Sequence, residues 1–445
     1  MDVNVWNKKN STFPDPIFIN KTKIRSPMFT QNDLFAKALM IEKPWFVEEV
    51  KFDLAAGKLE IWIDFERGST FYFEDEELGI KGQFKAYDTT RKTWRHLNFF
   101  QYQCLLHAWV PRVDLGNGKV RQVQTPWEGH AAGFTLLFEA LILELVKVMP
   151  VHNICNLFGI NDNKVWKMIT SYTEKARACE DFSSVEVVGM DEKAVRKGHD
   201  YVSLFVDMEE KRTMFVTEGK DSNVIEDFVE DLMDHGGQPE NIQQVSCDMS
   251  PAFIKGVEEN LPNADIVFDR FHVTKVINEA VDKVRKAEVG NNPILRRTKY
   301  IFLKNSENLT QYQKQQLEGI RLCGLNLKTM RALNIREAFQ QIYEAPTPET
   351  FVTLLRKWYF WATHSRIEPI KEAAYTIARH WKGIISWIRY KISNGILEGF
   401  NSIFQAAKAK ARGYKRLDSI KAIIYLLTGK LDFSKINPYY VTHSN

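Results

Sequence analysis

Apolar and polar positions follow three different patterns along the chain. Residues 45–73 alternate with the period of two that is typical of strands, and residues 99–113 and 119–123 also favour strands. Between residues 134 and 178 the apolar positions recur at helical spacing. Beyond them, short apolar runs alternate with helical segments. We therefore predict an irregular polar arm up to about residue 32, a β-rich module, a helical middle and an α/β remainder.

The helical middle has the spacing of a helix-turn-helix motif. Its first two helices cover residues 134–148 and 151–158, and after a turn at Gly159 the side chain of Asn161 caps a third helix that ends near residue 178. A packed helical hairpin without DNA contact has the same spacing, so spacing alone leaves both interpretations open. In a DNA-binding motif the third helix would present Asn163, Lys164, Lys167 and Thr170 to a major groove, while Val165, Trp166 and Ile169 pack inward.

Two aspartates stand at the ends of predicted strands in the α/β part. The apolar run 185–190 is closed by Asp191, and the run 242–247 is closed by Asp248. A strand, helix and strand in succession return the chain parallel to an earlier strand. The two strands can therefore be neighbours, with their carboxylates side by side.

The remaining elements of this part predict a strand order. Residues 201–207 and 212–218 are joined by a polar turn and form a hairpin that extends an antiparallel sheet. A helix at 222–235 leads into the Asp248 strand, and a third parallel strand follows at 265–268. Three antiparallel strands followed by two parallel ones is the ribonuclease H-like arrangement.

A third acid, Glu398, lies in a helical stretch that begins near Ser393, where Ser393 or Asn394 would cap the first turn. Each acid alone has an ordinary interpretation, because aspartates at strand ends commonly stabilise turns and helical glutamates commonly face solvent. Together they offer the hard oxygen ligands that a pair of divalent ions about 4 Å apart requires, one activating the attacking oxygen and one stabilising the leaving oxygen. We predict two magnesium or manganese ions at Asp191, Asp248 and Glu398.

An insertion separates Asp248 from Glu398, since 150 residues (398 − 248) exceed what the basic fold needs. Residues 291–390 are rich in helix formers and aromatic residues and carry almost no alternating pattern, so we predict an all-α insertion. Aromatic residues at helical spacing usually form a core. A minority, or the cations Arg366, Arg379 and Lys382, could contact DNA instead.

Two clusters of cations accompany the acids. Arg196 and Lys197 follow Asp191 closely, although a hairpin loop commonly carries such charges. The other cluster follows Glu398, where a solvated helix end is the ordinary interpretation and phosphate contact is the one that we favour. It consists of Lys408, Lys410, Arg412, Lys415 and Arg416.

Four short motifs carry a resemblance to a known family. They are Gly-Met-Asp-Glu at 189–192 followed by Arg-Lys-Gly-His at 196–199, Val-Ser-Cys-Asp-Met-Ser at 245–250, Asp-Arg-Phe-His at 269–272, and Ser-Asn-Gly at 393–395 with Glu-Gly at 398–399. With Trp-Arg-His-Leu at 94–97 and residues 107–113, this combination resembles the DDE transposases of bacterial insertion sequences, within them the ISL3 family. The resemblance implies that Asp191, Asp248 and Glu398 form the catalytic triad. It also implies that Asp269 and His272 match the Asp-x-x-His motif of related transposases, as a further metal ligand, a phosphate or proton contact, or a helix cap.

The β-rich module departs from the pattern of that family, whose members carry a zinc-binding module built on Cys-x-x-Cys pairs. Residues 74–90 contain no cysteine, and a turn at 114–118 replaces the second cluster. Only Cys104 and His107 remain, whereas tetrahedral zinc takes four such ligands. We expect a zinc-ribbon-like module without metal.

Composition agrees with this interpretation but would not have suggested it. The 445 residues carry 60 basic and 56 acidic side chains, a net charge of +4, so DNA affinity must come from local patches. Five scattered cysteines form no metal or disulfide framework, which suits a reducing cytoplasm. We expect no secretory signal and no membrane span, because charged residues interrupt the longest apolar stretch at 134–149.

The sequence thus predicts a multidomain α/β DNA transposase of the bacterial cytoplasm and nucleoid. It would bind terminal inverted repeats and target double-stranded DNA, cut and transfer strands with divalent metal, and act as a homodimer or higher oligomer. The alternatives are a domesticated DNA-binding regulator that no longer cuts, and another ribonuclease H-like nuclease such as a resolvase. We expect an arm at 1–44, a β-rich module at 45–131, a helix-turn-helix at 132–180, a catalytic core at 181–290 and 391–432 around the insertion at 291–390, and a tail at 433–445.

Overall fold

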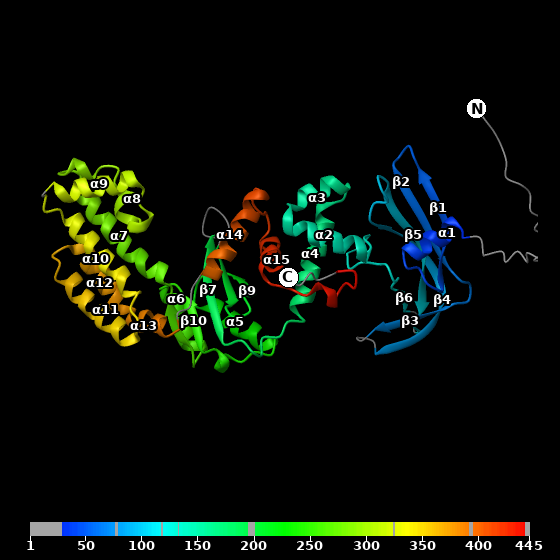
Figure 1. Cartoon of the computed structure of the whole chain (residues 1–445). Coiled ribbons are helices and arrows are strands. Elements are labelled where there is room, and N and C mark those ends of the chain that lie inside the picture. Colours follow the sequence, from blue (N-terminus) through cyan, green and yellow to red (C-terminus); the bar gives the residue numbers. More distant parts are fainter. Residues whose placement is uncertain are drawn as a thin grey trace, which may run out of the picture. The chain divides into compact units, whose positions relative to one another are not determined.

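The chain folds into two compact units, Met1–Glu128 and Gly129–Asn445 (Figure 1). The computed structural model describes residues 29–440 apart from 76–78, 117–118, 132, 195–200, 324 and 391–394. The protein is of mixed α/β class, with one sheet in each unit. None of the described helices is long and apolar enough to cross a membrane.

The first unit is a curled sheet of strand order β1-β2-β5-β4-β3, with β6 paired to β5. The ring of Phe71 in β3 lies 5.6 Å from that of Trp45 in β1 and 5.1 Å from that of Phe65 in β2, so the sheet bends around an apolar core. The strands are β1 (Trp45–Asp53), β2 (Lys58–Phe65), β3 (Thr70–Asp75), β4 (Ile80–Arg95), β5 (Gln103–Asp114) and β6 (Val120–Gln122).

Two elements of this unit were not predicted. Strand β4 is continuous over 16 residues, but its inward positions begin with Gly82, Phe84 and Ala86, which give a weak apolar signal. Helix α1 (Gln31–Ala38) lies within the segment that we expected to be an arm. Its first turn is closed by a capping box between Thr30 and Asp33.

The helix-turn-helix prediction is confirmed nearly residue by residue. The three helices are α2 (Leu136–Val148), α3 (Val151–Phe158) and α4 (Asp162–Arg177). Gly159 ends α3 in the left-handed conformation with a φ of 62°, which glycine adopts without strain. The Asn161 side chain accepts a hydrogen bond from the Asn163 backbone N–H at 2.9 Å and so caps α4.

The second sheet has the order β11-β10-β7-β8-β9, as the sequence predicts. Strands β7, β8 and β9 pair antiparallel, while β10 pairs parallel to both β7 and β11. Two crossover helices, α5 and α6, connect β9 to β10 and β10 to β11. Their bounds are β7 (Val187–Ala194), β8 (Tyr201–Asp207), β9 (Arg212–Glu218), α5 (Asn223–Asp234), β10 (Gln244–Cys247), α6 (Pro251–Asn260) and β11 (Asp265–Phe268).

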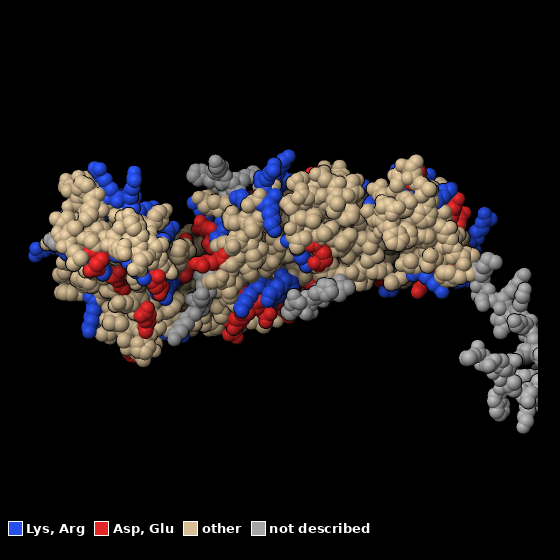
Figure 2. Space-filling model, turned by 45° about the horizontal axis from the view of Figure 1, so that its top comes forward, with Lys and Arg blue, Asp and Glu red and all other residues tan. Residues whose placement is uncertain are grey.

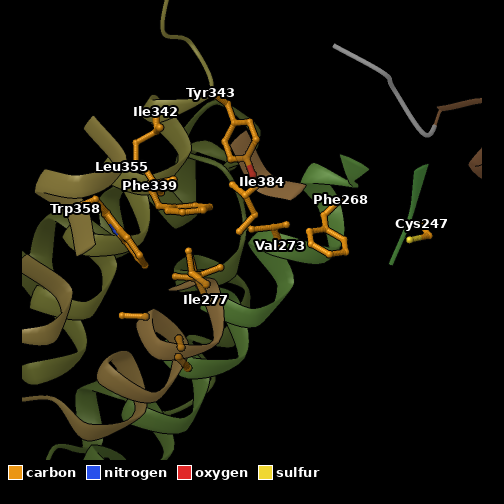
Figure 3. Packing of buried hydrophobic residues seen from close by; sticks show 14 of the residues in the cluster. Cys247, Phe268, Val273, Ile277, Phe339, Ile342, Tyr343, Leu355, Trp358 and Ile384 are labelled. Carbon is orange, nitrogen blue, oxygen red and sulfur yellow. The ribbon is translucent and has the colours of Figure 1, made fainter. Parts of the chain in front are cut away.

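The predicted insertion is helical throughout its described residues and packs on one long helix, α7 (Arg270–Val289). In Figure 3, Phe339 and Trp358 lie beside Ile277 of α7, and the two rings are 4.7 Å apart. Trp358 is therefore a core residue, whereas Trp361 is 45% exposed. The helices are α8 (Lys299–Leu303), α9 (Gln311–Leu322), α10 (Lys328–Ile342), α11 (Pro348–Thr363), α12 (Glu368–Arg379) and α13 (Trp381–Tyr390), with short 3-10 turns η2 (Pro293–Leu295) and η3 (Ser306–Asn308). A further 3-10 turn, η1 (Pro239–Asn241), lies outside the insertion, between α5 and β10.

The last α-helix, α15 (Leu417–Thr428), packs on α4 and on β9, the edge strand on the other side of the sheet from β11. Residues from η4 (Phe433–Lys435) to Tyr440, part of the expected tail, pack against the helix-turn-helix. The fully buried Asn437 side chain donates to the Leu136 carbonyl and to the Tyr172 hydroxyl, both at 2.8 Å. The C-terminal segment therefore forms part of the helical bundle.

Candidate active site and DNA interface

The pairing of β7 with β10 brings the two predicted aspartates to one edge of the sheet. Ser246 pairs with Gly189 in the parallel register, so Asp248 and Asp191 each follow two residues further along neighbouring strands. Parallel strands lie about 4.8 Å apart. The expectation that these carboxylates are neighbours therefore agrees with the register.

Helix α14 (Gly395–Lys410) covers the same end of β7 and carries Glu398 in its first turn. Gly189 permits this approach, because a Cβ there would meet the Leu397 side chain at 3.2 Å and the Met208 sulfur at 2.4 Å. One turn after Glu398, the Asn401 side chain donates to Asp191 Oδ2 at 2.9 Å. The helix is therefore fixed on the strand that carries the first acid. The prediction that this strand ends at Asp191 is wrong, because pairing with β8 continues β7 through Asp191 to Ala194.

Glu398 itself is exposed and lines a cleft together with Asp269. The predicted caps Ser393 and Asn394 lie outside the described residues. Within the part of the chain that is described, no three Asp, Glu, His or Cys side chains are gathered closely enough to hold a metal ion. The carboxylate of Asp191 is instead shared by Asn401 and by Lys193, whose ammonium lies 2.7 Å from Oδ2.

Negative charge nevertheless accumulates where β10 ends beside Asp191 of β7; we call this part of the sheet, with the start of α7, the acidic edge. Burial raises the pKa of Glu192, and the nearby carboxylates of Asp248 and Asp191 raise it further. The pKa of His272 is also raised, first by Asp269 and then by Asp248 and Asp191. Hard oxygen donors with surplus negative charge fit a hard divalent cation in chemistry, although the side chains as placed do not form one cage.

Asp269 and His272 occupy the start of α7. Asp269 is 9% exposed and accepts a hydrogen bond from the Phe271 backbone N–H at 3.1 Å, so the helix-capping interpretation is confirmed. Its other oxygen lies 3.3 Å from His272 Nδ1, within ion-pair distance but not aligned as a hydrogen bond. The half-buried His272 thus faces the acidic edge while Asp269 holds the helix.

Sequence reasoning gave no role to Glu192 or Asn401, and it suggested Lys193 only as part of a cationic patch after Asp191, whereas the structure pairs Lys193 with Asp191 itself. All three lie within or beside the motifs that carry the family resemblance, Glu192 in Gly-Met-Asp-Glu and Asn401 three residues after Glu398. The helical spacing of Asn401 from Leu397 was the available signal, because positions four apart share a face. A polar residue on the face that packs against the sheet indicates a partner there.

The two leftover zinc-type residues of the first unit have separate structural roles. Cys104 lies in the core of the curled sheet, where burial raises the pKa of its thiol to about 12. His107 stacks on Trp62 with ring centroids 4.4 Å apart, and its Nδ1 lies 2.9 Å from the Thr93 hydroxyl. Three residues apart on one strand, the two side chains lie on opposite faces of the sheet.

Helix α4 presents the residues predicted to face DNA. Asn163, Lys164 and Lys167 are exposed, and Thr170 is half-buried in a groove between α4 and α15. The inward positions Val165 and Ile169 are fully buried, as predicted. Trp166 is half-buried, and its ring lies 6.1 Å from that of Tyr414.

This aromatic contact joins α4 to the cationic segment after Glu398. That segment forms the turn between α14 and α15, in which Gly413 has a φ of 93°. Lys408 donates to the Ala194 carbonyl at 3.4 Å, while Lys410, Arg412, Lys415 and Arg416 are exposed. Arg196 and Lys197 lie outside the described residues.

The two patches are 248 residues apart in sequence, counted from Trp166 to Tyr414 (414 − 166), and this ring contact makes them neighbours in the fold. We call α4 residues 163–170 together with the turn 408–416 the basic surface. Figure 2 shows Lys and Arg interspersed with Asp and Glu over the face it draws, which agrees with the small net charge. Cations are therefore placed locally, as expected for DNA contacts in a nearly neutral chain.

The end of α4 is tied to the second sheet. Arg177 pairs with Asp231 of α5 at 2.7 Å and donates to the Tyr425 hydroxyl at 2.9 Å, and this hydroxyl accepts from the Val216 backbone N–H of β9. Both members of the Arg177–Asp231 pair are largely buried, so they are screened less than surface charges. The helix-turn-helix and the sheet are therefore held together through α4.

Comparison with known proteins identifies these parts. Residues 188–424 match the DDE transposase family of ISL3 elements, described as "Transposase", and residues 123–173 match the "Helix-turn-helix domain of transposase family ISL3". The transposase for insertion sequence element IS1001 of Bordetella parapertussis is 25% identical over 351 residues, which cover 76% of this chain and 85% of that protein. The transposase for IS1557 of Mycobacterium tuberculosis is 23% identical over 424 residues, covering 88% of this chain and 94% of that protein.

The first match spans more than half of the chain, and it includes the strands and the helix that carry all three acids. The second match contains the helix-turn-helix that the structure shows. Enzymes of this family depend on divalent metal ions to cut and transfer DNA. The chain belongs to the ISL3 family of DDE transposases of bacterial insertion sequences.

Proposed function

We propose that Asp191, Asp248 and Glu398 hold two magnesium or manganese ions in a catalytic domain of ribonuclease H-like fold. The observation that supports this most is the position of α14, which is fixed on β7 by the Asn401–Asp191 hydrogen bond beside the Asp248 strand. Bound ions would activate the attacking water or 3′-hydroxyl and stabilise the leaving oxygen. Zinc is not expected, because carboxylate oxygens without sulfur or imidazole favour harder cations.

The side chains around the acids have distinct parts in this proposal. Asn401 orients the Asp191 carboxylate, and Lys193 balances its charge until a cation replaces the ammonium. His272 keeps its positive charge to a higher pH than an ordinary histidine because Asp269 raises its pKa. A cation at this place suits contact with the scissile phosphate or transfer of a proton.

We further propose that the basic surface binds the terminal inverted repeats of the element. The exposed Asn163, Lys164 and Lys167, with Thr170, would enter the major groove, and the 408–416 turn would contact phosphates. Arg196 and Lys197, next to Asp191 in sequence, remain candidate contacts to the cut DNA. Because two element ends must be joined to target DNA, we expect a dimer or higher oligomer on DNA in the bacterial cytoplasm, at the nucleoid.

The test is a cleavage assay with the purified full chain. DNA that carries the repeats flanking its own gene is incubated with magnesium, and nicks and joined products are mapped. We expect cuts at the repeat ends and joining to a target duplex, both lost when the metal is chelated. Binding without any cut would instead indicate a DNA-binding regulator, and cutting without joining would indicate a nuclease of the resolvase type.

A further inference from the structure

A cleft of about 880 Å³ opens beside Glu398, on the side facing the helical insertion. It lies between the first turns of α7, the segment from α8 to η3, and the start of α14. Neither the acidic edge nor the basic surface uses most of it. The lining residues that matter here are Phe271, Asn278, Lys304, Asn305, Gln340 and Trp387.

The floor of the cleft is organised by a buried cation. Arg336 is 1% exposed, and among the described residues it has no carboxylate within ion-pair distance. Its guanidinium donates instead to the side-chain oxygen of Asn278 at 2.6 Å and to that of Asn305 at 3.1 Å, and also to the Leu303 carbonyl. Burial lowers the pKa of Arg336, the charge of Glu337 partly opposes this shift, and the direct hydrogen-bond partners of the guanidinium are amide oxygens.

This arrangement fixes which way the two amides face. A guanidinium can only donate hydrogen bonds, so the oxygens of Asn278 and Asn305 must point toward Arg336. Gln340 also donates to the Asn305 oxygen, at 2.7 Å. The –NH₂ groups of Asn278 and Asn305 are therefore left as donors for a ligand in the cleft.

The walls of the cleft combine flat apolar surface with negative charge. Phe271 at the rim is 60% exposed, so its ring offers a flat apolar surface to a ligand in the cleft. The ring of Trp387 packs against that of Tyr343 at 4.8 Å, and the Arg270 guanidinium lies over the Tyr343 ring. The carboxylates of Asp269, Glu307 and Glu398 line the cleft together with the cations Arg270 and Lys304, a net charge of −1 (2 − 3) that gives a phosphate no net attraction.

We propose that this cleft binds one unpaired nucleobase of the element end, next to the phosphate that is cut. A neutral, flat ligand suits the aromatic walls and the acidic lining, whereas a phosphate suits neither. Fixed amide donors select a base edge with acceptors, such as N7 and O6 of guanine or the carbonyls of thymine. The proposal rests on the proposed function, and it adds that the enzyme opens the duplex at the cleavage point.

The structure also suggests variants that separate this role from folding. Phe271→Ala removes the exposed ring, and Phe271→Trp keeps a stacking surface. Asn305→Asp keeps an oxygen acceptor for Arg336 and Gln340 but replaces the outward donor by an acceptor. Phe360→Ala is the matched control, because Phe360 is 64% exposed on the same helical insertion but lies outside the cleft.

The experiment uses the full chain and repeat DNA with 2-aminopurine at successive positions around the cut. With the metal chelated, the wild type should raise the fluorescence at one position, which reports an unpaired base. Phe271→Ala and Asn305→Asp should lose this signal and cut paired ends at least about tenfold more slowly, with cutting restored on ends that carry a mismatch at that position. Phe271→Trp should recover part of the signal and of the cutting rate that Phe271→Ala loses, and Phe360→Ala should behave as the wild type.

Two outcomes would overturn the proposal. One is a wild type that cuts the ends while no position becomes unpaired, and the other is a mismatch that fails to restore cutting by Phe271→Ala and Asn305→Asp although both proteins melt normally. A wild type that neither cuts nor joins repeat ends would refute the proposed function itself. The two failures are therefore distinguishable.

Discussion

The acidic edge of the sheet and the basic surface use charge in opposite ways. At the acidic edge the charged groups stand on packed strands and helices, where burial and then Asp248 and Asp191 raise the pKa of Glu192, and Asp269 is the main cause that raises the pKa of His272. On the basic surface, cations such as Lys164, Lys167 and Arg412 extend from α4 and a turn into solvent. Metal-dependent cleavage requires oxygen ligands at fixed positions, whereas binding to the DNA backbone requires only a sufficient number of cations near the phosphates.

This difference predicts two kinds of response to mutation. Loss of one of the proposed metal ligands should abolish DNA cleavage without weakening DNA binding. Loss of one cation among several should lower the affinity for DNA by a moderate amount that depends on the salt concentration.

The largest effect is expected at the three acids. Asp191→Asn, Asp248→Asn and Glu398→Gln each remove a hard ligand and keep the shape of the side chain, so cleavage should fall by about a thousandfold or more. Binding to repeat DNA should stay within a few-fold of the wild type. The exposed acid Glu226 on α5 gives the control Glu226→Gln, which should cut normally. Normal cleavage by any of the three variants would remove that carboxylate from the site.

The next largest effect is expected at His272. His272→Ala should slow cleavage by at least roughly tenfold, because the acidic edge would lose a cation suited to phosphate contact or proton transfer. Thermal stability should change little, since Asp269 still caps α7 through the Phe271 N–H. The control Glu279→Ala changes an exposed side chain on the same helix. A lower melting temperature with full activity in the cold would instead make the motif structural.

A smaller, graded effect is expected on the basic surface. Lys164→Ala and Lys167→Ala should each weaken repeat binding several-fold and reduce the slope of log affinity against log salt by about 1. The pair Lys410→Ala and Arg412→Ala should do the same if the α14–α15 turn shares the interface. Lys314→Ala, on the insertion, is the control. Unchanged affinity and salt slope would make α4 a packing element only.

The parts of the molecule that the sequence predicts best are those determined locally. The three helices of the helix-turn-helix could be placed because Gly159 and Asn161 mark their ends directly. The order of the second sheet could be predicted because a crossover helix leaves few alternatives. By contrast, β4 carries polar residues on an exposed face, and its continuity depends on β5 as a partner.

The sequence suggests the acids of the proposed site but not the side chains around them. Asp191 and Asp248 could be found because each closes an apolar run, whereas the Asn401–Asp191 bond depends on how α14 packs over Gly189. The contact of Trp166 with Tyr414 likewise joins segments that the sequence keeps far apart. The two amide donors that Arg336 fixes in the cleft beside Glu398, Asn278 of α7 and Asn305 after α8, come from separate segments, and no short motif contains them.

The smallest expected effect concerns an acid that belongs to neither region. Glu139 of α2 is fully buried and accepts hydrogen bonds from the His130 and Ala131 backbone N–H groups at 2.8 and 2.7 Å and from the Tyr172 hydroxyl at 2.8 Å. Burial raises its pKa despite these bonds. The folded state therefore holds its proton more tightly than the unfolded state, so the contribution of Glu139 to stability is largest below the ordinary carboxyl pKa and is lost as the pH rises through the raised value.

Glu139→Gln removes this titration while leaving a side chain of similar shape. Hydrogen exchange of α2 and α4 amides, corrected for intrinsic rates, should show protection that falls with rising pH in the wild type across that window and stays level in the variant. Cleavage chemistry should respond to this substitution only through the stability of the helix-turn-helix, because Glu139 lies apart from the acidic edge. If protection depends on pH equally in both proteins, the three hydrogen bonds offset the effect of burial on the pKa of Glu139. Its carboxylate would then be as stable in the folded state as one exposed to water.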